Sequence, residues 1–114
     1  MVVEGCLFCG IVAGDVEADV VHVTERTVAF RDVNPQAPTH VLVVPRDHYA
    51  DAAELAAGDP EASAELVTTA AAVAAAEGHE DYRLVFNTGV GAGQSVFHTH
   101  LHLLAGRPVT WPPG

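Results

Sequence analysis

The stretch His98-Thr-His-Leu-His-Leu-Leu104 carries a histidine at every second position. Because side chains of a β-strand alternate between its two faces, this spacing predicts a strand with all three histidines on one face. The residues between the histidines are mostly apolar, and their side chains are expected to pack against a core on the other face.

Three interpretations of this histidine face are open. A solvated strand face can carry histidines without a function, although three in register beside a glycine-rich loop disfavour this choice. Three imidazoles can also bind a catalytic zinc, since zinc sites with three protein ligands keep an open position. The third interpretation, a histidine nucleophile, depends on the loop that precedes the strand.

That loop, Asn87-Thr-Gly-Val-Gly-Ala-Gly-Gln-Ser95, has three glycines spaced by two. Glycine lets backbone N–H groups approach an anion without obstruction by a Cβ atom, which is typical of phosphate-binding segments. The lysine and the spacing of a Walker loop are missing, but Gln94 and Ser95 add side-chain donors directly before the histidines. A neutral imidazole is nucleophilic near a pKa of about 6.5. The combination predicts phosphoryl chemistry with a histidine nucleophile.

The rest of the chain predicts an α+β fold. Alternating and β-branched segments indicate four further strands, and the five expected strands are Val20–Thr24, Thr27–Arg31, His40–Pro45, Arg83–Asn87 and Val96–Leu104. Because strands in hairpins surround one long inserted helix, we expect a five-stranded antiparallel sheet. Residues 1–114 then form a single domain, in which the proline-rich residues 108–114 are an irregular tail.

Two helices are expected between the third and fourth strands. A short helix over Asp51–Ala57 is followed by Asp59, which is suited to cap a second helix, and by Pro60, which is suited to begin it. This long helix runs to Glu77, and Gly78 stops it. Its apolar face is expected to pack on the sheet and consists of Leu66, Val67, Ala70, Val73 and Ala74.

Length and composition exclude other functions. A chain of 114 residues with 49% hydrophobic content is long enough for one compact domain. A formal net charge of −10 and the absence of lysine argue against binding to nucleic acid or to an anionic membrane. The longest uncharged apolar stretch, Leu66–Ala76, is too short to span a bilayer, and the N-terminus does not resemble a signal peptide. We therefore expect a cytoplasmic protein.

Cys6 and Cys9 form a Cys-x-x-Cys pair and are the only cysteines in the sequence. In an intracellular protein such a pair indicates metal binding or redox chemistry before a structural disulfide. The redox role requires the pair to follow a strand at a helix N-terminus, and no strand is predicted there, so metal binding is favoured. Two buried cysteines without a metal remain an alternative.

His98-Thr-His-Leu-His-Leu-Leu104 resembles the signature of the histidine triad family, in which three histidines alternate with apolar residues. Three other segments resemble its Hint branch, the purine nucleoside phosphoramidate hydrolases: Asp32-Val-Asn-Pro-Gln-Ala-Pro-Thr-His-Val-Leu-Val-Val-Pro45, Gly93-Gln-Ser-Val-Phe-His98 and Trp111-Pro-Pro-Gly114. The likeness runs from about Cys6 to Gly114. The chain departs from the pattern at Thr99, where an apolar residue is usual, at Ala105, where glycine is common, and at Arg31, where histidine is frequent. Arg31 leaves the base preference open.

The resemblance implies a hydrolase that cleaves adenosine phosphoramidates or acyl-adenylates at the α-phosphorus and releases AMP. Its nucleophile is then His100, which forms a nucleotidyl-histidine intermediate that water hydrolyses, with no metal in the chemical step. The resemblance further implies that His102 and Ser95 contact the phosphate and that His40 completes the histidine cluster. The other nucleotide-binding positions that it implies are Phe8, Ile11, Phe30, Asp32, Val33, Asn87, Gly93 and Gln94.

The resemblance extends to a zinc-binding subset of the family, in which the ligands correspond to Cys6, Cys9, His48 and His98. A closed set of four ligands is structural and anchors the N-terminus instead of activating water. The resemblance also implies a homodimer, in which the C-terminal segment with Trp111 reaches the partner's site. Two alternative functions are left: a dinucleoside polyphosphate hydrolase of the Fhit type and a non-catalytic nucleotide-binding module.

Overall fold

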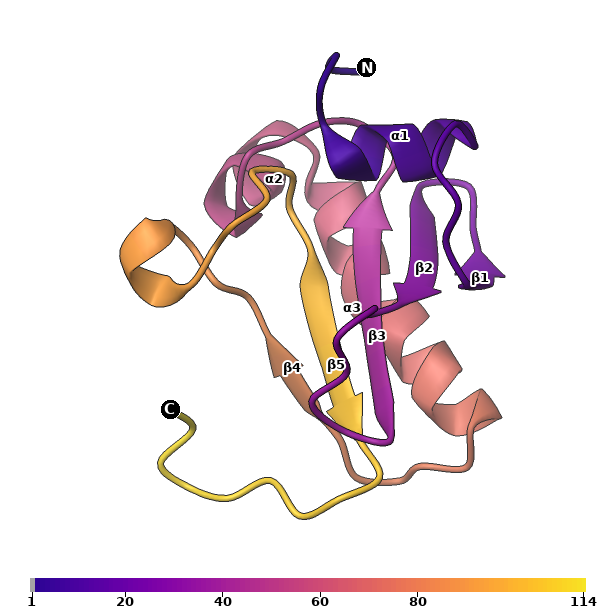
Figure 1. Cartoon of the computed structure of the whole chain (residues 1–114), viewed down its shortest axis with the longest axis vertical. Helices are drawn as coiled ribbons and strands as arrows, with labels where there is room; N and C mark the ends of the chain where they lie inside the picture. The colour runs from indigo at the N-terminus through magenta and orange to yellow at the C-terminus, as the bar shows by residue number, and fades with distance from the viewer. Residues whose placement is uncertain (1) are drawn as a thin grey trace.

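The structure, a computed structural model, describes residues 2–114. Within these residues, five strands form one antiparallel sheet in the order β1-β2-β3-β5-β4 (Figure 1). The strands are β1 (Val20–Val23), β2 (Thr27–Arg31), β3 (Thr39–Pro45), β4 (Arg83–Val85) and β5 (Leu101–Ala105). The predicted α+β fold with a five-stranded antiparallel sheet is confirmed.

Helices cover both faces of this sheet. They are α1 (Leu7–Ala13), α2 (Ala52–Gly58) and α3 (Pro60–Ala76), together with the short 3-10 helix η1 (Val90–Ala92). Successive residues of the central strands point to opposite faces: Ala29 and Val41 join the apolar cluster under α3, whereas Phe30 and Leu42 join the cluster under Phe8 of α1. In Figure 1, α3 lies behind the sheet and α1 crosses its upper end in front.

Helix α3 begins and ends as the sequence predicts. The Asp59 side chain accepts a hydrogen bond of 3.1 Å from the backbone N–H of Ala62, and Pro60 occupies the first turn. At the other end, Gly78 adopts a left-handed φ of 80°, and the N–H of His79 donates to a carbonyl of the last turn. The long helix is therefore fixed by local signals at both ends.

The assignment of one residue to the apolar face of α3 is wrong. Val67 is 44% exposed, while Leu66, Ala70, Val73 and Ala74 pack on the sheet. Thr69 is buried on the sheet side, and its hydroxyl lies 2.9 Å from the hydroxyl of Thr27 on β2. Hydrogen bonding satisfies this buried polar pair, so a threonine takes a place where hydrophobicity alone favours valine.

Helix α1 is not predicted from the sequence alone. Its seven residues include Gly10 and the β-branched pair that follows it, which lower the local helix preference. Packing compensates, because the Phe8 ring stands edge-on to the Phe30 ring with centroids 5.4 Å apart. Cys6 caps the helix by accepting a hydrogen bond from the N–H of Cys9. The cysteine pair therefore lies at a helix N-terminus.

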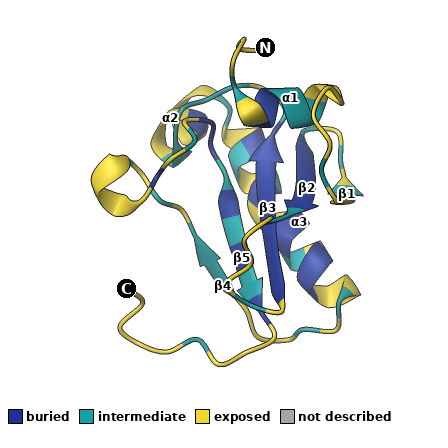
Figure 2. Cartoon of the chain, viewed as in Figure 1, coloured by how far each residue is buried: buried dark blue, intermediate teal, exposed yellow. Residues whose placement is uncertain are grey.

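The C-terminal segment leaves the sheet after β5. Residues 106–114 form no helix or strand, and Trp111 is 82% exposed. Arg83 of β4 holds the tail by donating to the carbonyl of Thr110 at 2.9 Å. Figure 2 shows the exposed tail and the buried central strands. None of the helices within residues 2–114 is long and apolar enough to cross a membrane.

Candidate functional site

The strand predicted to carry the three histidines is shorter than expected and contains only His102. Strand β5 begins at Leu101 instead of Val96, because the N–H and hydroxyl of Thr99 bond to the carbonyl of Tyr49, at 2.7 and 3.0 Å, in place of a strand partner. Leu101 lies in the cluster under α3, and the ring of His100 lies on the opposite side of the chain, beneath the Phe8 ring at 5.0 Å. The predicted separation of histidines from the core holds for His100 and His102, which line the pocket opposite Leu101 and Leu103, whereas the side chain of His98 lies beside Cys6 and Cys9.

The ring of His100 is oriented by the backbone that precedes it. Its Nδ1 lies 2.8 Å from the carbonyl oxygen of His98. A carbonyl accepts only, so Nδ1 carries the proton and Nε2 keeps a lone pair. Since His100 also lines a pocket on the α1 side of the sheet, Nε2 is the atom of the ring that can react there.

A chain of hydrogen bonds fixes the ring of His102 in the same way. The backbone N–H of Gln36 donates to Nδ1 of His40 at 3.0 Å, so His40 is protonated on Nε2. That Nε2 lies 2.9 Å from Nδ1 of His102 and donates to it. The proton of His102 is therefore on Nε2, where it is a donor for a ligand in the pocket.

Burial keeps these two rings neutral. It lowers the pKa of His102 to about 4, and positive charge on His100 or His40 acts in the same direction. Burial also lowers the pKa of His40, although the carboxylate of Asp32, 3.4 Å from Nε2, opposes this shift. Neutral rings each offer one donor and one acceptor, as the hydrogen-bonded chain requires.

The glycine-rich loop contains η1 and is held in place by Gln94. This side chain is only 3% exposed, accepts from the N–H of Gly89 at 2.9 Å, and donates to the carbonyls of Ala50 and Val96 at 2.7 and 3.1 Å. Both polar atoms of the Gln94 amide are thus hydrogen-bonded to the backbone, so this side chain positions the loop. Ser95, the next residue, lines the pocket.

The pocket has a volume of about 340 Å³ and lies over the α1 side of the sheet. It gathers all but Gln94 of the nucleotide-binding positions expected from the sequence: Phe8, Ile11, Phe30, Asp32, Val33, Asn87, Gly93, Ser95, His100 and His102. Its polar end contains the histidines and the loop, whereas Phe8 and Phe30 wall the apolar part. His40 lies behind His102 and acts on the pocket through that ring.

Seven further residues that line the pocket are not predicted from the sequence. They are Leu7, Val16, Glu17, Ala18, Arg31, Leu42 and Val96, of which Arg31 is recognised only as a departure at the pocket edge. Leu42 pairs with His102 across β3 and β5, a register that only the structure shows. Residues 16–18 precede β1 and reach the pocket only through the tertiary fold, for which the sequence carries no motif.

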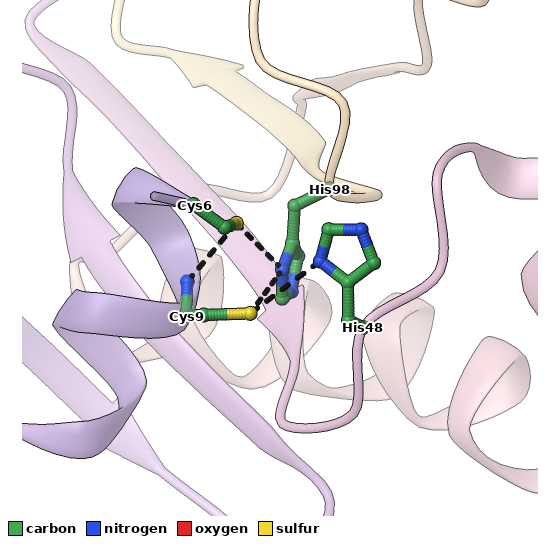
Figure 3. Close-up of side chains that lie close together, drawn as sticks. All are labelled: Cys6, Cys9, His48 and His98. Carbon is green, nitrogen blue, oxygen red and sulfur yellow. Dashed lines mark hydrogen bonds between the residues drawn. The ribbon is translucent and has the colours of Figure 1, made fainter. Parts of the chain in front are cut away.

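A second cluster joins four side chains from three parts of the chain. Figure 3 shows Cys6 and Cys9 of the α1 region facing His48, from the loop after β3, and His98, which precedes β5. Nδ1 of His98 lies 3.5 Å from each sulfur, and Nδ1 of His48 lies 3.4 Å from the sulfur of Cys9. All four candidate ligand atoms lie within 4.8 Å of one another. The structure thus brings together the whole set expected to bind metal.

The donor set and its spacing fit a tetrahedral zinc ion. Ligands 2.0–2.3 Å from such an ion lie roughly 3.3–3.8 Å apart, which matches the sulfur–nitrogen distances. Nε2 of His98 donates to the carbonyl of Pro45 at 2.9 Å, leaving Nδ1 free to bind metal. Burial lowers the pKa of His98 to about 4, so the ring is neutral as a ligand must be. The side chain of His98 faces the cysteines, which disfavours one zinc shared by the three alternating histidines.

Alternating histidines beside a glycine-rich loop, on an antiparallel sheet backed by one long helix, define a class of compact α+β domains. The chain belongs to the HIT domain family, whose model matches residues 13–109. The family membership that the histidine stretch indicates is thereby confirmed.

Relatives match the chain over nearly its whole length. The crystal structure of a HIT family hydrolase from Legionella pneumophila has a TM-score of 0.91 and 48% identity, covering 96% of this chain and 100% of that one. The purine nucleoside phosphoramidase of Escherichia coli is 38% identical over 108 residues, 93% of this chain and 91% of that protein. The 14 kDa zinc-binding protein of Zea mays is 43% identical over 111 residues, 95% of this chain and 87% of that protein.

Proposed function

We propose that this protein is a nucleotide hydrolase that cleaves the bond at the α-phosphorus of adenosine phosphoramidates or acyl-adenylates and releases AMP. The observation that carries the proposal is the orientation of His100, whose Nδ1 bonds to the carbonyl of His98 and whose Nε2 keeps a lone pair toward the pocket. The similarity to a purine nucleoside phosphoramidase supports the same reaction.

The reaction proceeds in two displacements at phosphorus. Nε2 of His100 forms a bond to the α-phosphorus while the bond to the leaving amine or acyl oxygen breaks, and its electron pair goes to the leaving group. An amine takes a proton from water as it leaves. In the nucleotidyl imidazolium, Nδ1 keeps its proton and its hydrogen bond to the carbonyl of His98. Water then attacks phosphorus, and the bond between phosphorus and Nε2 breaks with its electron pair returning to Nε2. The attacking water loses a proton to solvent, which replaces the proton that the amine took from solvent.

Neutral donors hold the phosphate in this proposal. Nε2–H of His102, the hydroxyl of Ser95, and Asn87 and Gly93 at the loop all line the polar end of the pocket. Asp32 lines the same pocket next to the exposed Val33, and in this proposal its carboxylate accepts from the ribose hydroxyls. His40 contributes through His102, because its hydrogen bond decides which nitrogen of His102 carries the proton.

We further propose that the Cys6, Cys9, His48 and His98 cluster binds a structural zinc ion. A bound zinc supplies a crosslink between α1, the loop after β3 and the segment before β5. With four protein ligands it has no open position for water, so the chemical step needs no metal. The zinc-binding relative from Zea mays supports this assignment.

We also propose that the protein is a homodimer in the cytoplasm. Strand β4 ends the sheet and is free to pair with another chain. Large apolar side chains are exposed next to it in sequence and in the tail, namely Tyr82, Phe86 and Trp111. Exposed apolar groups next to an open sheet edge favour association, which analytical ultracentrifugation can measure directly.

Turnover of a fluorogenic adenosine phosphoramidate tests the proposed function. We expect turnover by the wild type, loss of at least about a thousandfold in His100→Ala, and full activity of His22→Asn, which removes a partly buried histidine outside the pocket. Activity should survive a chelator at a temperature where the fold is intact. Activity that a chelator abolishes while the fold survives would instead indicate metal in the chemical step.

The remaining outcomes separate the alternatives. A wild type that cleaves only dinucleoside polyphosphates would replace the phosphoramidase proposal by the longer-substrate hydrolase. A wild type that binds AMP and turns over neither substrate would indicate a binding module.

A further inference from the structure

The pocket runs across the sheet from β5 toward β1. His102 on β5 pairs with Leu42 on β3, and Leu42 pairs with Phe30 on β2, so these three residues mark a line across three strands. Each strand is about 4.8 Å from the next, which makes this floor about 10 Å long. The end beyond Phe30 is walled by residues 16–18, which precede β1.

Glu17 places a carboxylate at that end of the pocket. The residue is exposed, and within residues 2–114 it has no hydrogen-bond or ion-pair partner of its own. Arg31 is the nearest cation in the lining, but its guanidinium is held by Glu77 and Asp19. Glu17 is therefore available to accept hydrogen bonds from a ligand.

The segment that carries Glu17 is held in place on its C-terminal side. The N–H of Arg31 donates to the carbonyl of Asp19 at 3.0 Å, and its Nε lies 3.5 Å from the Asp19 carboxylate. Ala18 packs in the apolar cluster with Phe8 and Phe30. These contacts fix the backbone next to Glu17, so its carboxylate can contribute to selectivity.

The orientation of the nucleotide, which rests on the proposed function, decides what Glu17 meets. With phosphorus at His100, a nucleotide that follows this floor would place its base at Phe30 and the purine edge farthest from the sugar toward residues 16–18, which wall that end. This edge carries positions 1, 2 and 6. In guanine, N1–H and the 2-amino group are adjacent donors that match the two oxygens of one carboxylate. In adenine, position 1 is a lone pair, which a carboxylate repels.

We propose that Glu17 determines base specificity and makes guanosine conjugates better substrates than adenosine conjugates. The carboxylate accepts from N1–H and the 2-amino group of guanine, and it meets at most one donor, the 6-amino group, in adenine. The contact lies at the solvent-exposed mouth of the pocket, so its effect is at the low end for a paired contact to a base edge, on the order of tenfold.

Calorimetric titration of GMP, IMP and AMP into the wild type and Glu17→Gln tests this proposal. We expect GMP to bind on the order of tenfold more tightly than AMP, with IMP between them because it lacks the 2-amino group. Glu17→Gln should remove most of the ratio between GMP and AMP. Asp15→Asn, which removes a nearby exposed charge outside the pocket lining, should leave that ratio unchanged.

Turnover of matched guanosine and adenosine phosphoramidates separates this proposal from the proposed function. Hydrolysis of both at equal kcat/KM, or a preference that persists in Glu17→Gln, would overturn the role of Glu17 and leave the hydrolase intact. Failure to bind or cleave either nucleotide would overturn both.

Discussion

Nδ1 of His100 lies 2.8 Å from the carbonyl oxygen of His98, and the ring of His98 faces Cys6 and Cys9. One residue therefore belongs to two sites: its backbone orients the ring of His100, and its side chain completes the Cys–His cluster. A change in the cluster is expected to reach the pocket through this single peptide unit.

Loss of a zinc ligand should remove the metal and weaken the fold. Cys9→Ser keeps the size of the side chain but replaces a cysteine that is only 1% exposed. We expect a zinc content near zero and a lower Tm, since an ion present at a thousand times its Kd stabilises by about 4 kcal/mol. A chelator should lower the Tm of the wild type and not that of the variant. Equal Tm values of the wild type and Cys9→Ser in the presence of zinc would contradict this expectation.

Loss of the His40 ring should reduce catalysis without removing any group that touches the substrate. His40→Asn removes the hydrogen bond to Nδ1 of His102, so nothing then holds the proton of that ring on Nε2. An unsatisfied buried partner costs about 1–3 kcal/mol, which corresponds to roughly five- to 150-fold in kcat/KM. Steady-state kinetics of the variant measure this loss. A variant with the same kcat/KM as the wild type would show that the hydrogen-bonded chain has no catalytic role.

The low pKa of His102 predicts acid destabilisation. An unfolded imidazole gains a proton below a pH of about 6.5, whereas folded His102, with a pKa of about 4, stays neutral until lower pH. Between these values the unfolded state binds more protons, so the free energy of unfolding falls as the pH drops from 6.5 to about 4. His102→Gln does not titrate and should lose less stability over this range than the wild type in urea unfolding. An equal pH dependence would contradict the assignment.

Gln94 should matter more for the loop than its predicted role as a phosphate donor suggests. Gln94→Ala leaves three backbone groups without their partner and is expected to cost about 1–3 kcal/mol in urea unfolding. The loosened loop should also raise KM through Ser95. Gln36→Ala is the control, because that side chain is exposed and bonds only to the carbonyl of Asn34. Equal losses in both variants would contradict the anchoring role.

The sequence predicts elements whose signals are local. Asp59 and Pro60 begin α3 and Gly78 ends it, and the histidine period places His100 and His102 opposite the core. Helix α1 has no comparable local signal, because its formation depends on Phe8 packing against a strand far along the chain. Glu17 is missed for the same reason, since the pocket that it lines exists only after the sheet has formed.

The central claim, that His100 is the nucleophile, is tested most directly by trapping its intermediate. A single turnover of adenosine phosphoramidate is quenched, and the digested protein is searched by mass spectrometry for an adenylyl group. We predict the group on the peptide with His100 in the wild type and on no peptide in His100→Ala, which should bind AMP but fail to turn over. Turnover by His100→Ala at the wild-type rate, or an adenylyl group on another residue, would contradict the claim.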